Sequence, residues 1–390
     1  MMDTSTGNCF DTSAPEMKSQ MEDTAEKSRH LNTKNPFENT LENTAYRSDY
    51  RKILPQVIIP DFHMPLFPEK TERRGIRRFF NAAGWGILLS TLAEQILFTI
   101  LLYIILAFMG VTLDAYSTDD SISSYLNNSS IFIALNGIVY ASVNFFSAYL
   151  GCHSIQTPIR SLFQTENLKI RRIFMYISIG IGLQYAAGIL YTWVSSFFAS
   201  SGIELTEADF SYFQSTKSTI AVFLYTCILA PITEELLFRG FLMKALSCVS
   251  IRFGIVTSAL IFGLAHGNVE QFLLAFIVGL FFGKIVVRHN SIMPSIWVHI
   301  GINTLSLLFN LADEKLTSDT GLMILMLLDM VYIAIAIIGI LFWLWRERKE
   351  PLPYPTQKQS IRIRIFWTSP ALLGAIVLQI LIMIFNNILA

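Results

Sequence analysis

Long apolar runs alternate with short polar segments along most of this chain of 390 residues. A helix needs about 20 residues to cross a hydrocarbon core that is about 30 Å thick. A search for apolar runs of this kind finds nine, of which the fifth is short enough to be a partial span. We therefore expect nine helical spans, at 84–112, 131–152, 170–200, 218–247, 252–266, 270–288, 294–312, 321–345 and 368–389.

Backbone polar groups in lipid need partners inside the protein, which helices supply and an open sheet does not. No alternating strand pattern competes with the apolar runs. The fold class predicted from the sequence is therefore all-α, a polytopic transmembrane helical bundle. We assign residues 76–169 to N-terminal transmembrane helices, 170–312 to a central helical core and 313–390 to C-terminal transmembrane helices.

Residues 1–75 differ from the rest of the chain because they are dominated by Asn, Thr, Ser, Asp, Glu and Lys. Such a segment buries too little apolar surface to offset the entropy lost on ordering. We expect a disordered cytoplasmic tail here. A basic start followed by an apolar core is also missing, so the sequence predicts no cleavable signal peptide.

Composition and charge support the membrane interpretation. Hydrophobic residues make up 53% of the chain and charged residues 15%, whereas about a quarter of the residues of an ordinary soluble domain are charged. The net charge is zero, which gives no reason to expect a nucleic-acid partner. Lys and Arg concentrate in alternate loops, while the other set of loops holds only Lys217 and Lys315. We therefore expect an integral protein of the plasma membrane with a cytoplasmic N-terminus and an external C-terminus.

The fourth predicted span carries three ionisable residues, Glu234, Glu235 and Arg239. Ionisable side chains deep in a bilayer cost several kcal/mol unless they face a cavity or a partner, so each is a functional candidate. Glu235 and Arg239 are four residues apart on one helix face, the spacing of an ion pair, and Glu234 points about 100° away. The pair would neutralise one carboxylate and leave the other free for chemistry.

Two further motifs lie in the fifth and seventh predicted spans. The turn between spans four and five is centred near Ser250, so Glu234 and His266 should reach the same depth, where they can share a water. His299 and Asn303 are four residues apart on one face, and two such hydrogen-bond donors can hold a developing oxyanion. Each residue taken singly has a structural interpretation, as a packed ion pair or a satisfied core histidine. Their convergence at compatible depths on three helices favours a function.

The order Glu234-Glu235-xxx-Arg239, Phe262-xxx-His266 and His299-xxx-Asn303 resembles the CPBP family. This family comprises type II CAAX prenyl endopeptidases and bacteriocin-processing intramembrane proteases, and is also called the Abi family. The resemblance covers roughly 170–312. It implies that Glu234 and His266 activate the attacking water, that His299 and Asn303 form the oxyanion site, and that Glu235 and Arg239 support them.

The resemblance leaves the cofactor open, because such proteins are described both as metalloproteases and as metal-free glutamate proteases. If zinc is bound, its ligands would be Glu234, His266 and His299. The sequence lacks the HExxH motif, and Asn303 is a poor zinc ligand, which favours a carboxylate-activated water.

We therefore predict an intramembrane endopeptidase that cleaves a membrane-associated peptide or protein, in CAAX-type processing, peptide maturation or immunity to a bacteriocin. Two other classes remain open from the residues alone. A proton-coupled membrane transporter can also place Glu and His on facing helices, although its inverted repeat is not visible in the sequence. A non-catalytic membrane scaffold could keep the same fold for binding.

Overall fold

The structure is a computed structural model, and it describes residues 68–118, 122, 125–126, 129–165, 168–205, 216–316, 318–347 and 359–389. Every regular element in these ranges is a helix, so the predicted all-α class is confirmed. The elements are α2 (Pro68–Met109), α3 (Leu113–Thr118), α5 (Ser130–Ser154), α6 (Ile159–Leu162), α7 (Ile170–Ser200), α8 (Thr216–Val222), the π-helix η3 (Phe223–Leu229), α9 (Ala230–Glu234), the π-helix η4 (Glu235–Leu242), α10 (Met243–Leu246), α11 (Ile251–Leu264), α12 (Val269–His289), α13 (Met293–Lys315), α14 (Asp319–Glu347), α15 (Gln359–Phe366), α16 (Pro370–Ile384) and the π-helix η5 (Phe385–Leu389).

All nine predicted apolar segments are helical, and in the described residues eight helices are long and apolar enough to cross a membrane. The ninth, α11, has 14 residues and is about 21 Å long, short of a hydrocarbon core of about 30 Å. It is therefore the partial span that its short apolar run predicted. The eight longer candidates are Arg73–Met109, Ser130–Ser154, Ile170–Ser200, Thr216–Leu246, Val269–His289, Met293–Ala312, Thr320–Leu341 and Pro370–Asn387.

Helix α2 begins earlier than the sequence suggested, at Pro68 and not near residue 84. Proline suits the first turn of a helix, where its missing N–H has no intrahelical acceptor. The basic segment that follows contains good helix formers, so the helix continues from it into the apolar span. Most of the predicted tail at 1–75 lies outside the described residues, and its last eight residues belong to this helix.

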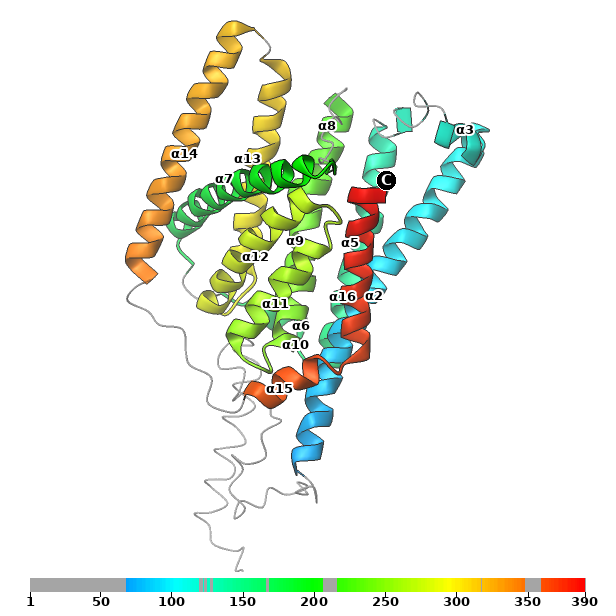
Figure 1. The fold of residues 1–390 in the computed structure, drawn as a ribbon, viewed down its shortest axis with the longest axis vertical. Coiled ribbons are helices and arrows are strands. Elements are labelled where there is room, and N and C mark those ends of the chain that lie inside the picture. Colours follow the sequence, from blue (N-terminus) through cyan, green and yellow to red (C-terminus); the bar gives the residue numbers. More distant parts are fainter. Residues whose placement is uncertain are drawn as a thin grey trace, which may run out of the picture.

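The helices form two groups around a central one (Figure 1). On one side, α2 packs against both α5 and α16. On the other side, α7 packs against α12, α13 and α14. Between them runs Thr216–Leu246, called here the fourth span, which contains α8, η3, α9, η4 and α10 as one continuous helix.

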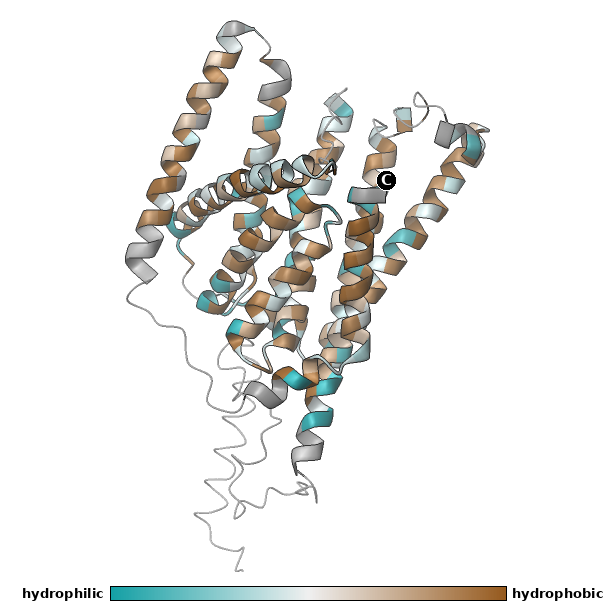
Figure 2. Cartoon of the chain, viewed as in Figure 1, coloured by the Kyte–Doolittle hydropathy of each residue, from teal (hydrophilic) through white to brown (hydrophobic). Residues whose placement is uncertain are grey.

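Brown, hydrophobic residues cover the outer helices in Figure 2, and teal residues gather at the start of α2 and along α15. Helices α2 and α14 expose many large apolar side chains, among them Phe108 and Met330. A water-soluble protein rarely exposes apolar patches of this extent. Together with the eight long apolar helices, this surface identifies an integral membrane protein. The side of the membrane on which the N-terminus lies stays a prediction.

The polar residues of the fourth span are surrounded by protein. Every residue from Thr233 to Ser250 is buried, including Glu234, Glu235 and Arg239. The turn between α10 and α11 covers 247–250, and the Ser250 side chain caps α11 by accepting from the Phe253 backbone N–H. The predicted hairpin centred near Ser250 is therefore confirmed, and it folds α11 back along the fourth span.

Candidate active site

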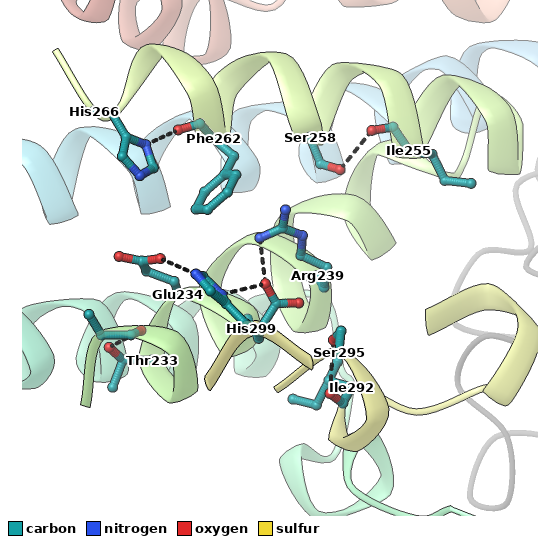
Figure 3. Close-up of polar contacts among 12 residues, drawn as sticks. Thr233, Glu234, Arg239, Ile255, Ser258, Phe262, His266, Ile292, Ser295 and His299 are labelled. Atoms are coloured by element: carbon teal, nitrogen blue, oxygen red, sulfur yellow. Dashed lines mark hydrogen bonds and ion pairs between the residues drawn. The ribbon is translucent and has the colours of Figure 1, made fainter. Parts of the chain in front are cut away.

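The six polar side chains selected from the sequence come from three parts of the fold. Glu234 ends α9, Glu235 and Arg239 lie in η4, His266 follows α11, and His299 and Asn303 lie in α13. Figure 3 shows Glu234, Arg239, His266 and His299 around one region, with Phe262 between His266 and Arg239. Glu234 and His299 are each 7% exposed, and Glu235 and Arg239 are fully buried.

The Glu235–Arg239 ion pair predicted from the i,i+4 spacing is confirmed. Arg239 Nη1 donates to Glu235 Oε1 at 2.7 Å. The guanidinium also lies over the Phe262 ring, with Cζ 4.0 Å from its centroid, in the geometry of a cation–π contact. Gly279 makes room for it, because a Cβ at this position would lie 3.0 Å from Arg239 Nη2. The pair is thus enclosed on every described side and has no access to solvent.

His299 lies between the two adjacent glutamates. Its Nδ1 is 3.3 Å from Glu235 Oε1, and its Nε2 is 3.8 Å from Glu234 Oε2 (Figure 3). A carboxylate only accepts, so the first contact requires a proton on Nδ1. The second distance is too long for a direct hydrogen bond. Since Glu235 is already neutralised by Arg239, Glu234 is the carboxylate of the two that remains available.

Glu234 is held by a residue that the sequence reasoning missed. Tyr140 of α5 donates its hydroxyl to Glu234 Oε1 at 2.6 Å. Charge-assisted bonds of this length are strong, and this one fixes the orientation of the carboxylate. A tyrosine in an apolar helix gives no sequence signal of such a role, because it also serves ordinary packing at membrane interfaces.

Glu94 of α2 was also missed, although a signal for it existed. It is an ionisable residue in the first predicted span, so the rule that selected Glu234 applies to it as well. In the structure it is partly buried and close enough to interact electrostatically with both Glu234 and Tyr140. The site therefore extends onto α2 and α5, beyond the three spans that the sequence indicated.

His266 is oriented by its own backbone. Its Nδ1 lies 2.8 Å from the Phe262 carbonyl oxygen, which can only accept, so the proton is on Nδ1. In the neutral ring Nε2 is then an acceptor. Figure 3 shows the ring directed toward the side on which Glu234 lies. No direct hydrogen bond joins these two described side chains, which is compatible with a shared water and leaves the predicted pairing untested.

The turn that carries His266 is held by the C-terminal helix. Gly267 has a φ of 73°, a left-handed conformation that glycine adopts without strain. Asn386 and Asn387 both donate to its carbonyl oxygen at 3.3 Å, and Asn387 Oδ1 accepts from the Val269 backbone N–H. The position of the imidazole therefore depends on a helix far from it in sequence.

Asn303 donates one of its two side-chain amide N–H groups to a backbone carbonyl. It donates to the Thr226 carbonyl oxygen at 2.9 Å. In the π-helical register of η3 the Ala230 N–H bonds to Tyr225, and the next residue, Pro231, has no N–H to offer Thr226. Asn303 satisfies the carbonyl that this register leaves free, and its second N–H remains available. The sequence predicted none of the three π-helical segments.

The donor set proposed for zinc was Glu234, His266 and His299. In the part of the chain that the structure describes, no three carboxylate, imidazole or thiol groups are arranged so that they could hold a metal ion. As placed here, these side chains do not fit a zinc site, which needs three protein ligands about the metal and an open fourth position.

Comparison with known proteins identifies a family that one part of the chain matches. Residues 216–305 match the model of a family described as Type II CAAX prenyl endopeptidase Rce1-like, and all six sequence-selected side chains lie within them. An uncharacterized 24.3 kDa protein of Escherichia coli is 30% identical over 102 residues, which are 25% of this chain and 47% of that protein. The chain thus spans about half the length of this curated relative. No solved structure matches the chain.

Proposed function

We propose that this protein is an intramembrane endopeptidase that hydrolyses a peptide bond in a membrane-associated peptide or protein, because residues 216–305 match the Type II CAAX prenyl endopeptidase Rce1-like family. The observation that carries the proposal is the burial and hydrogen bonding of the Glu234 carboxylate. Its carboxylate is buried, its Oε1 is held by Tyr140, and its Oε2 has no direct hydrogen bond to His299. A carboxylate fixed on one side and free on the other suits a general base.

In the proposed reaction, Glu234 Oε2 accepts a proton from a water molecule while the water oxygen attacks the carbonyl carbon of the scissile bond. His266 Nε2 accepts a hydrogen bond from the same water and orients it, because Nδ1 is already committed to the Phe262 carbonyl. Proton transfer from Glu234 to the leaving nitrogen then breaks the C–N bond. Water and one peptide bond give one carboxylate and one amine.

The developing oxyanion needs hydrogen-bond donors nearby. We assign this role to His299 and to the Asn303 N–H that Thr226 does not use. His299 Nε2 faces Glu234, so a substrate oxygen near Glu234 is within its reach. Because Nδ1 already donates its proton to Glu235, this role requires the doubly protonated ring, in which both nitrogens donate. Glu235, paired with Arg239, holds the opposite nitrogen and fixes the ring.

The proposal is tested by looking for the products of cleavage. Membranes from cells that make the full chain and from matched cells that lack it would be compared by mass spectrometry of peptide termini. We expect new termini in membrane-associated proteins or peptides only where the chain is present. A synthetic peptide that covers one such site should be cut by the purified protein in lipid. If no terminus depends on the chain, the peptidase assignment is wrong.

A second measurement addresses the metal. Since the described donors do not form a metal site, we expect the purified protein to keep its activity after exhaustive chelation. Elemental analysis of the same preparation should give far less than one zinc per chain. Loss of activity on chelation, with recovery on adding zinc but not magnesium, would instead establish a metalloprotease.

A further inference from the structure

A cavity of about 640 Å³ lies between α2 and α5, outside the family match and apart from the candidate active site. Basic and polar residues line one part of it and apolar residues another. Trp85, Leu89 and Leu150 of its wall are 66%, 41% and 47% exposed, so the cavity borders the surface that faces lipid. Its lining residues are Arg74, Arg77, Arg78, Asn81, Ala82, Trp85, Gly86, Leu89, Ser147, Leu150, Gly151 and Ser154.

The lining residues of α2 are ordered by polarity along one helix face. Arg74, Arg78, Trp85 and Leu89 are separated by four, seven and four residues, which keeps them on one side of the helix. Charge comes first, then the amphipathic indole, then the aliphatic side chain. From Arg74 to Leu89 the helix rises about 22 Å, close to half of a bilayer that is about 40–45 Å thick with its headgroups. The wall thus has the polarity profile of one lipid leaflet.

Two polar atoms in this cavity lack a partner among the described residues. They are Asn81 Oδ1 and the hydroxyl of Ser147, a residue that is only 1% exposed. Asn81, which is partly exposed, lies one turn beyond Arg77 and Arg78, where its amide can bind a headgroup hydroxyl. Buried polar groups without partners are uncommon, so the cavity is suited to a ligand with polar groups.

Two glycines set the shape of the cavity. A Cβ at Gly86 or at Gly151 would lie 2.5 Å from the Phe241 ring. The missing side chains therefore let this ring, which belongs to the fourth span, enter between α2 and α5. Phe241 lies in η4, the same helix as Glu235, so these two glycines of the cavity wall pack against the helix that carries the candidate catalytic residues.

We propose that this cavity is a binding site for an anionic phospholipid. Its phosphate is bound by Arg74, Arg77 and Arg78, its headgroup hydroxyl by Asn81, and an acyl chain lies along Trp85 and Leu89. Exposed cations next to a span attract anionic lipids, and the cavity converts this general attraction into a defined site. The inference does not depend on peptidase activity, because lipid binding is measured directly.

The test uses the full chain in nanodiscs of phosphatidylcholine with increasing phosphatidylglycerol, and native mass spectrometry to count the phosphatidylglycerol molecules retained. We expect one molecule to be retained by the unchanged protein. Arg74→Gln with Arg78→Gln should weaken its retention about 30-fold, from the typical contribution of each cation near a charged surface. The matched control, Arg171→Gln with Arg172→Gln at the start of α7, should change it by no more than about threefold.

A second variant separates the cavity from charge alone. Ala82→Phe adds a ring to the cavity and leaves all three arginines in place, so it should also displace the bound lipid. Unchanged retention in the Arg74 and Arg78 variant would overturn the proposal. Equal losses in the Arg171 and Arg172 control would do the same, because they would show attraction to basic surface in general.

Discussion

Glu234→Gln should lower the rate of peptide hydrolysis by about a thousandfold, the scale expected when a general base is removed. The substitution keeps the size of the side chain, and the amide oxygen can still accept from Tyr140, so the surrounding packing is preserved. The amide cannot take a proton from water at neutral pH. The loss should therefore appear in kcat and leave substrate binding nearly unchanged, as measured by single-turnover kinetics on a peptide identified by its termini.

Two comparison variants make this result specific. Glu204→Gln, in the exposed segment after α7, should retain full activity. Tyr140→Phe removes the hydrogen bond to Oε1 and keeps the carboxylate, so its loss should be smaller, about tenfold. Full activity in the Glu234 variant would exclude Glu234 as the base. The same result is expected if the chain is a non-catalytic scaffold and another protein performs the cleavage.

The part of the site that could be predicted from sequence is the part that local geometry fixes. Glu235 and Arg239 pair because residues four apart share a helix face, and this holds although η4 is a π-helix. The meeting of the fourth span with α11 followed from one hairpin centred near Ser250. Both inferences needed only helix periodicity and the length of a turn.

The part of the site that could not be predicted from the sequence depends on contacts between helices that are distant in sequence. Tyr140 and Glu234 are 94 residues apart, and nothing in either segment specifies that α5 packs on α9. Asn386 and Asn387 reach Gly267 across about 120 residues. Such partners depend on which helices lie next to each other in space, which a single sequence does not reveal. Glu94 is different, because the rule for ionisable groups in lipid would have selected it.

Asn303 illustrates a third reason why the site could not be fully predicted from the sequence. Its amide was assigned to an oxyanion, whereas the structure gives one of its two N–H groups to Thr226. The cause is a π-helical register whose free carbonyl faces α13. Pro231 is visible in the sequence, but a proline alone predicts only a break or a kink. The bond makes Asn303 a structural link between α13 and the fourth span as well as a candidate donor.

Arg239→Met should destabilise the fold by about 3–5 kcal/mol, the typical cost of leaving a buried charge without its partner. Glu235 would lose the guanidinium 2.7 Å from its Oε1, in a site with no access to solvent. His299 would remain as its hydrogen-bond partner and compensate only in part. The measurement is thermal unfolding of the purified protein in one detergent, with Arg171→Met at the exposed start of α7 as the control.

The double variant Glu235→Gln with Arg239→Met decides whether the charge or the packing is responsible. Replacing both members of a buried pair by neutral groups of similar size is often close to neutral in stability. The glutamine can still accept from His299, and methionine fits the space between Phe262 and Gly279. We therefore expect the double variant to recover most of the stability lost in the single one. If it is as unstable as Arg239→Met, the cation–π contacts of the guanidinium, and not the uncompensated carboxylate, dominate the cost.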